Sequence, residues 1–199
     1  LGDVYKRQTL DSASANLKKQ SGSFSELLGS YGITKDTRNR AFMPTSGSIV
    51  SFNQSLPIFA DKQAISNTFR ATKYKSITND VVGAGKLYLS AINGMGEDDV
   101  RISKRKSLSS KRLRGFERNK VGPVDGSDHI GGNYVAALNF EATLPNLLPE
   151  SYKTDVGLFL DFGNVWGVDY DDSIDESNEI RSSTGLAASW LSPIGPLSF

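Results

Sequence analysis

The residues of this sequence that could do chemistry are mostly charged ones. The chain contains no cysteine and a single histidine, His129, which leaves too few ligands for a thiolate metal site, a zinc site or a Ser-His-Asp triad. The sequence also shows no nucleophile beside a base, no phosphate-binding loop and no metal-ligand cluster. It therefore predicts a protein that is not an enzyme and that uses no cofactor and no metal.

A strongly basic stretch covers residues 101–120, where the only acid is Glu117. Its basic residues are Arg101, Lys104, Arg105, Lys106, Lys111, Arg112, Arg114, Arg118 and Lys120. Such a run can bind nucleic acid, but aromatic residues do not interleave with it, and a lumen lined by acids or an anionic membrane leaflet explains the charge as well. We interpret it as a solvated loop and predict no nucleic-acid partner.

An acidic stretch occurs later in the chain. It contains Asp169, Asp171, Asp172, Asp175 and Glu176. Carboxylates bind Ca²⁺, but the stretch lacks the glycine and the terminal glutamate of an EF-hand loop. We interpret it as the exposed tip of a hairpin, and His129, in a Gly-Ser-Asp stretch, as a loop residue rather than a ligand.

The elements that position these charges have the pattern of β-strands. From about residue 20 onward, segments of alternating polarity are separated by clusters of Gly, Pro, Asn, Asp and Ser. The expected strands are residues 24–35, 48–59, 64–76, 81–93, 133–144, 155–166 and 180–191, with a further start at Leu197. No apolar run approaches the ~18 residues that a membrane helix needs.

Alternation divides the last strands into an apolar face and a small or polar face. Residues 156, 158, 160 and 162 are apolar, whereas Asp155, Gly157, Phe159 and Asp161 share the other face; in residues 133–144, Glu141 likewise opposes the apolar positions. A soluble β-sandwich would turn the apolar face to a dry core, and a membrane barrel would turn it to lipid. Strand length favours the barrel, because membrane strands need ~9–11 residues and soluble strands average ~5–6. Trp166 and Trp190 fit an interfacial aromatic girdle.

The connections support the same class. Antiparallel strands place turns 36–47, 76–81, 145–154 and 192–196 at one end and connections 60–64, 93–132 and 167–179 at the other. Outer-membrane barrels have short periplasmic turns and longer extracellular loops, so the long loop at about 93–132 is expected to be extracellular. Because the chain ends inside a strand and lipid does not tolerate unpaired edges, we expect an incomplete barrel.

The first eight residues differ in pattern from the remaining sequence. Residues 1–8, LGDVYKRQ, match neither the polarity nor the periodicity of the later segments, so we interpret them as a non-native remnant and exclude them from fold reasoning. Residues 9–199 are expected to be the C-terminal part of an outer-membrane β-barrel domain.

The segment KRLRGFERNKVGP, residues 111–123, resembles the sixth extracellular loop of the BamA-type outer-membrane insertases, the bacterial surface antigen family, with the triplet Arg114-Gly115-Phe116 at its core. GGNYVAALNFEATLP, VGLFLDFGNVWG and IRSSTGLAASWLSPIGPLSF resemble the later strands of that family, and TKDTRNRAFMPTSGS resembles an earlier strand, turn and restart. The resemblance implies an all-β fold, the C-terminal half of a 16-stranded transmembrane antiparallel β-barrel with about eight strands present. It also implies POTRA domains upstream and location in the bacterial outer membrane.

The resemblance further implies a latch between the long loop and the barrel wall. The loop folds into the lumen in that family, and its arginine engages acidic wall residues, which match Arg114 with Glu141 and Asp161. An arginine suits this role because its planar charged fork can bind carboxylates bidentately, while Gly115 permits close backbone approach and Phe116 anchors the loop. The alternative is a solvated Arg114 and ordinary lumen carboxylates.

The implied function is the folding and insertion of β-barrel proteins into the bacterial outer membrane. The implied partners are unfolded outer-membrane β-barrel clients, periplasmic assembly lipoproteins and the lipid bilayer. Three alternatives stay open: a related barrel translocase for protein secretion, a passive porin or receptor, and a soluble β-sandwich binding module.

Overall fold

A computed structural model describes residues 2–7, 18, 20–96, 99–144, 147–149, 152, 154–169, 174, 178–192 and 195–198. In the part of the chain that it describes, the elements are almost entirely strands, with a short 3-10 helix in the long loop between β5 and β8. They are β1 (Gly2–Arg7), β2 (Gly22–Asp36), β3 (Gly47–Ala60), β4 (Ala64–Thr78), β5 (Val81–Gly94), η1 (Ile102–Lys104), β6 (Val124–Asp125), β7 (Asp128–His129), β8 (Tyr134–Leu144), β9 (Thr154–Trp166), β10 (Arg181–Ser192) and β11 (Gly195–Ser198).

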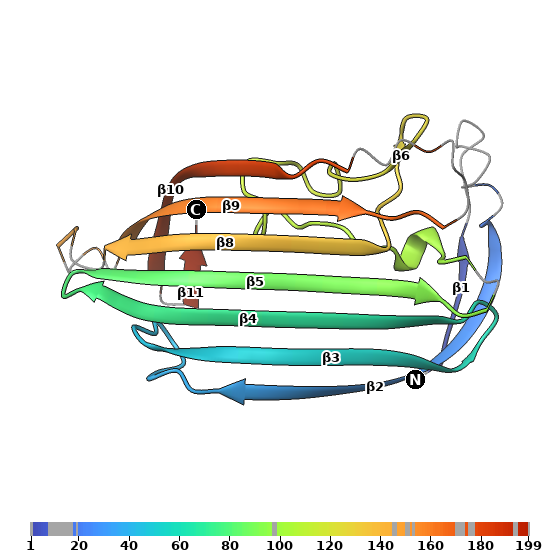
Figure 1. The fold of residues 1–199 in the computed structure, drawn as a ribbon, viewed down its shortest axis with the longest axis horizontal. Coiled ribbons are helices and arrows are strands. Elements are labelled where there is room, and N and C mark those ends of the chain that lie inside the picture. Colours follow the sequence, from blue (N-terminus) through green and yellow to red (C-terminus); the bar gives the residue numbers. More distant parts are fainter. Residues whose placement is uncertain are drawn as a thin grey trace.

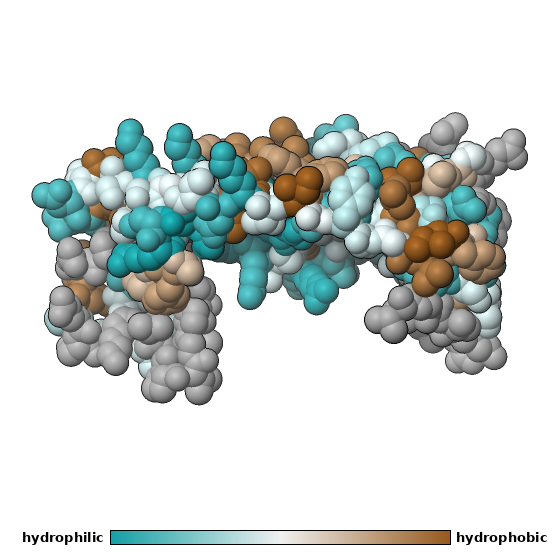
Figure 2. Space-filling view, turned by 90° about the horizontal axis from the view of Figure 1, so that it is seen from below, coloured by the Kyte–Doolittle hydropathy of each residue, from teal (hydrophilic) through white to brown (hydrophobic). Residues whose placement is uncertain are grey.

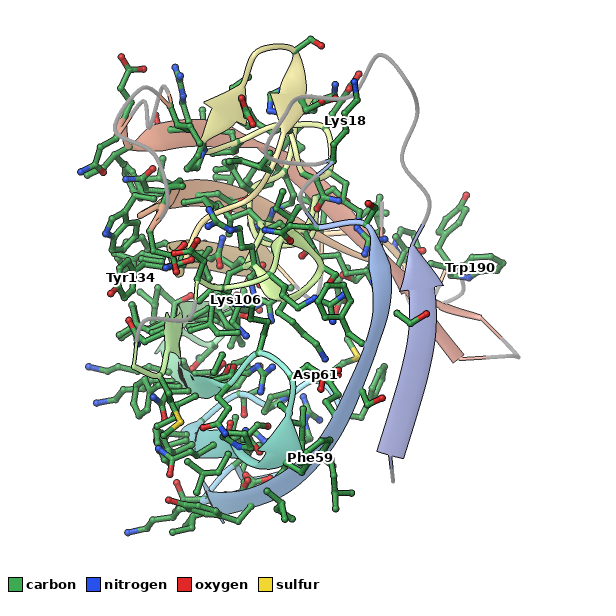
Figure 3. All side chains as sticks on the ribbon, turned by 90° about the vertical axis from the view of Figure 1, so that its right-hand side faces the viewer. Lys18, Phe59, Asp61, Lys106, Tyr134 and Trp190 are labelled. Carbon is green, nitrogen blue, oxygen red and sulfur yellow. The ribbon has the colours of Figure 1, made fainter. Side chains whose placement is uncertain are left out.

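Nine of these strands form one antiparallel sheet in the order β1-β2-β3-β4-β5-β8-β9-β10-β11 (Figure 1). Each strand pairs with its neighbour in the chain, except that β5 pairs with β8 because the loop holding the β6–β7 hairpin lies between them. The sheet is curved, and Figure 3 shows the loop segment around Lys106 lying inside the curve. The sheet is thus a curved wall with a loop on its concave side.

The expected strands agree with the observed ones to within two residues at each end. The segment expected at 24–35 forms β2, and the segment expected at 81–93 forms β5. The start expected at Leu197 belongs to β11, which begins at Gly195; Phe199 lies outside the described residues. The seven long strands have 11 to 15 residues, as the alternating segments predicted.

Residues set aside from the sequence-based fold contribute to the sheet. Gly2–Arg7 form β1, which pairs with β2 through a register that runs from Gly2 opposite Leu27 to Arg7 opposite Gly22. Their backbone is therefore compatible with an edge strand, although their composition gave no clear period. The interpretation of residues 1–8 as a remnant concerns their origin and stays a prediction.

The two faces of the sheet have the environments that alternation predicts. On the convex face Phe140 is 46% exposed and Leu158 54% exposed, whereas on the concave face Val135 is 1% and Asp161 0% exposed. Figure 2 shows exposed hydrophobic residues among hydrophilic ones along the surface of the sheet. Large apolar side chains on an outer face suit contact with hydrocarbon, because no second sheet covers them among the described residues.

The core lies between the concave face and the long loop. Loop residues Leu108, Leu113 and Val121 pack on three wall residues, Val135, Ala137 and Val165, and Tyr88 and Phe116 complete the cluster. The loop is therefore a packed part of the fold. Among the described residues, no helix has the length and apolar character required to cross a membrane.

Candidate functional site

The guanidinium of Arg114 meets the carboxylate of Asp161 in a bidentate pair. Nε donates to Oδ2 at 2.7 Å and one terminal nitrogen donates to Oδ1 at 2.6 Å, while the backbone N–H of Arg114 donates to Oδ2 at 3.1 Å. The Asp161 side chain has no exposed surface, and that of Arg114 is 23% exposed. A charge-assisted fork of this kind fixes orientation as well as position, so the loop is registered on β9.

Glu141 supplies the second carboxylate of the site. Its Oε1 lies 3.1 Å from the same terminal nitrogen of Arg114 that contacts Asp161. Its Oε2 accepts a hydrogen bond of 2.6 Å from the ammonium of Lys86 on β5. Two cations therefore balance two carboxylates, which limits the cost of holding these charges away from bulk water.

Strand register explains why these side chains meet. Asn139 on β8 lies directly opposite Asp161 on β9, and its side-chain N–H group donates to Asp161 Oδ1 at 2.8 Å and to the backbone carbonyl of Arg112 at 2.8 Å. Glu141 lies opposite Phe159, whose ring centroid is 3.8 Å from the guanidinium carbon of Arg114. Pairing one loop segment with two adjacent strands thus forms one charged, hydrogen-bonded and aromatic site.

The surroundings of Arg114 keep its guanidinium protonated. Burial lowers the pKa of the Arg114 guanidinium, but the hydrogen bond to Asp161 and the negative charges of Glu141 and Asp161 outweigh burial, so the pKa is raised overall. The arginine is therefore cationic at any physiological pH. The arrangement can hold a loop against a wall; among the described residues it includes no cluster of three or more metal-binding side chains.

Gly115 and Phe116 come directly after Arg114 and have different tasks. Gly115 has φ +82°, a region that favours glycine, and a Cβ built there would meet no atom within 4 Å. Phe116 is half-buried against the core cluster. The structure therefore brings together Arg114, Glu141 and Asp161, and the chain turns at Gly115 before Phe116, which packs on the core cluster.

Most of the basic stretch is engaged with the barrel wall, so its interpretation as a solvated loop is wrong. Arg101 and Arg105 are buried, at 8% and 9% exposure. Lys104 pairs with Glu26 on β2, and Lys106 donates to Ser66 on β4 at 2.6 Å.

The guanidinium carbons of Arg101 and Arg112 lie 3.7 Å from the ring centroids of Phe24 and Tyr88, respectively. Sequence alternation did not reveal these partners, because the aromatic residues come from distant strands and not from the basic run itself.

The single histidine and the first residue of the acidic stretch lie in connections between the long strands. His129 is exposed in the short β6–β7 hairpin, in keeping with its interpretation as a loop residue. Asp169 is partly exposed, but it is ion-paired with Arg105 at 2.5 Å. Asp171, Asp172, Asp175 and Glu176 lie outside the described residues.

A family model, the Omp85 superfamily domain, matches residues 2–199. The chain belongs to the Omp85 superfamily. Its fold agrees with a solved member, BamA from Haemophilus ducreyi lacking POTRA domains 1–3, with a TM-score of 0.76 at 24% identity, covering 89% of this chain and 38% of the other. The all-β barrel class predicted from the sequence is thus confirmed, with the barrel not closed within this chain.

Relatives in several organisms are named as assembly factors. The chain is 28% identical, over 99% of its length, to the outer membrane protein assembly factor BamA of Nitratidesulfovibrio vulgaris, and 26% identical, over 89%, to that of Neisseria meningitidis. It is 26% identical, over 79%, to the sorting and assembly machinery component 50 homolog of Bos taurus. The chain spans 25%, 26% and 35%, respectively, of the length of these relatives. The match of this Omp85 chain to BamA proteins confirms the family resemblance.

Proposed function

We propose that the protein containing this chain folds and inserts β-barrel proteins into the bacterial outer membrane. The observation that carries the proposal is the Omp85 match over residues 2–199, together with relatives named as assembly factors. The chain would supply part of the barrel wall, and its clients would be unfolded outer-membrane β-barrel proteins. Periplasmic assembly lipoproteins and the lipid bilayer would be its other partners, and nucleic acid would not be one.

The proposed mechanism needs neither an enzyme active site nor a cofactor. A barrel with a weakly closed seam would perturb lipid and offer a strand edge, and backbone pairing with a client strand would drive folding. Arg114, Gly115 and Phe116, with Glu141 and Asp161, would act as a loop-to-barrel latch that keeps the long loop inside the lumen. The latch would hold the wall in one shape while the seam opens.

Reconstitution of the full-length protein tests this function. The protein would be placed in liposomes, an unfolded outer-membrane barrel protein would be added, and its folding would be measured by the heat-modifiable mobility of the folded client on gels. We expect faster client folding than in empty liposomes and a loss of this acceleration for Arg114→Ala. Equal folding rates in empty and loaded liposomes would contradict the proposal, and ion conductance without assembly would favour a porin.

A further inference from the structure

The long loop is also held by a buried ion pair near the end of the sheet from which it emerges. The Arg105 side chain has no exposed surface; one terminal nitrogen donates to Asp169 Oδ1 at 2.5 Å and Nε donates to the carbonyl of Val100 at 3.3 Å. The other oxygen of Asp169 accepts the backbone N–H of Val100 at 2.8 Å. One carboxylate from the β9–β10 connection therefore holds both ends of the loop segment 100–105.

Backbone contacts reinforce this place. Lys106 and Gly132 form an antiparallel bridge with hydrogen bonds of 2.7 and 3.0 Å, and the N–H of Asn133 donates to the carbonyl of Gly167 at 2.7 Å. A Cβ at Gly132 would lie 2.4 Å from the carbonyl oxygen of Trp166. The two ends of the loop and the start of the β9–β10 connection are thus packed backbone to backbone.

We propose that Arg105 and Asp169 are positioning residues that form a second anchor of the loop, and that assembly of client barrels requires the loop to be held at this anchor as well as at Arg114. The proposal rests on the proposed function for its second part. Asp161 lies within β9, whereas Asp169 lies beyond its end at Trp166, and the five residue-to-residue steps from Asp161 to Trp166 alone span roughly 16 Å. Sites this far apart act independently unless they share partners.

The second anchor has a direct consequence for the wall. The connection that carries Asp169 leads into β10, which in turn pairs with β11. Because Asp169 contacts both Arg105 and Val100, a shift of Asp169 would act on the loop at this end. The anchor thereby ties the loop to the residues that directly follow β9.

Cysteine labelling of the full-length protein in liposomes tests the anchor, because this chain has no cysteine of its own. Two buried reporters would be used in a background without other cysteines. Ile130→Cys directly precedes Gly131, which packs against Arg105 and Lys106, and Val121→Cys lies in the core cluster. We expect Asp169→Asn to raise maleimide labelling at position 130 by roughly tenfold and to leave position 121 protected, because only the local charge-assisted contacts are lost. Arg118→Gln, in an exposed part of the same loop, is the matched control and is expected to change neither rate.

Unchanged labelling at position 130, or equal exposure of both positions, would overturn the anchor. The same variants would then be assayed for client folding, where we expect Asp169→Asn to slow folding severalfold and Arg118→Gln to leave it unchanged. Increased labelling with normal client folding would overturn the functional part of the proposal. A wild-type protein that does not accelerate client folding would refute the proposed function, whereas the labelling result would still decide the anchor.

Discussion

At the scale of single residues, the burial of Asp161 decides how sensitive the site is to substitution. Its carboxylate has no exposed surface and depends on Arg114 and Asn139 for its hydrogen bonds. A buried pair adds little net stability compared with apolar residues, but removing one partner leaves an uncompensated charge. The pair is therefore sensitive to single substitutions even though it is a modest source of overall stability.

Arg114→Ala in the full-length protein is expected to destabilise the docked loop by about 3–5 kcal/mol, because it leaves Asp161 buried without its cation. Arg114→Lys is expected to recover part of this, since an ammonium keeps the charge but not the bidentate fork. Limited proteolysis of the loop in the folded barrel measures the effect. Arg118→Ala serves as the control, and equal protease resistance of Arg114→Ala and wild type would refute the expectation.

Two glycines of the loop allow the cost of backbone strain to be compared with the cost of steric crowding when alanine is introduced. Gly115 and Gly122 both have positive φ, but a Cβ at Gly115 would meet nothing within 4 Å, whereas at Gly122 it would lie 2.7 Å from Cβ of Val165. Gly115→Ala is therefore expected to cost only about 1–2 kcal/mol of conformational energy. Gly122→Ala is expected to cost more, and thermal unfolding of the two variants in detergent should rank them in that order; the reverse order would contradict this expectation.

At the scale of elements, apolar packing on β8 and β9 attaches the loop alongside its ionic contacts. Leu113, at 1% exposure, lies among Leu108, Val121, Val135 and Val165, directly before Arg114. Its burial brings the guanidinium to the height of Asp161, so the apolar and ionic contacts support each other. A loop held only by charges would be easier to release.

Leu113→Ala is expected to cost about 2–5 kcal/mol, since it opens a cavity in a cluster with little room to collapse. The loss should appear as faster proteolysis of the loop, while β8 and β9 stay paired and the barrel still runs as a folded band on gels. Leu147→Ala, at an exposed position in the β8–β9 turn, is the control. Disappearance of the folded band in Leu113→Ala would mean that the cluster holds the whole wall and not the loop alone.

At the scale of the whole molecule, the convex face decides between lipid and water. Leu138, Phe140, Leu158 and Leu160 are all more than a third exposed on this face. An exposed face of this kind would be costly in water but suits the hydrocarbon of a bilayer. A charged side chain introduced on this face would therefore destabilise the barrel if the face meets lipid, and would be tolerated if the face meets water.

Leu160→Arg is expected to destabilise the full-length barrel in a bilayer by about 2–4 kcal/mol, if residue 160 lies near the midplane. Leu160→Phe keeps the position apolar and is expected to be close to neutral. Urea titration of the barrel refolded into liposomes measures both variants. An unchanged titration midpoint for Leu160→Arg would indicate that this face meets water and would argue against a membrane-facing wall.

The sequence by itself determined the strands and their faces, because side chains alternate with a period of two whatever the strand later pairs with. It thereby placed Glu141 and Asp161 inward, and the resemblance around Arg114 supplied their partner. Only the tertiary structure showed that Lys86, Asn139 and Phe159 complete the site and that Arg105 meets Asp169. Those contacts join residues 22 to 64 positions apart, and no local pattern encodes which distant strand a loop arginine will reach once the sheet has curved around it.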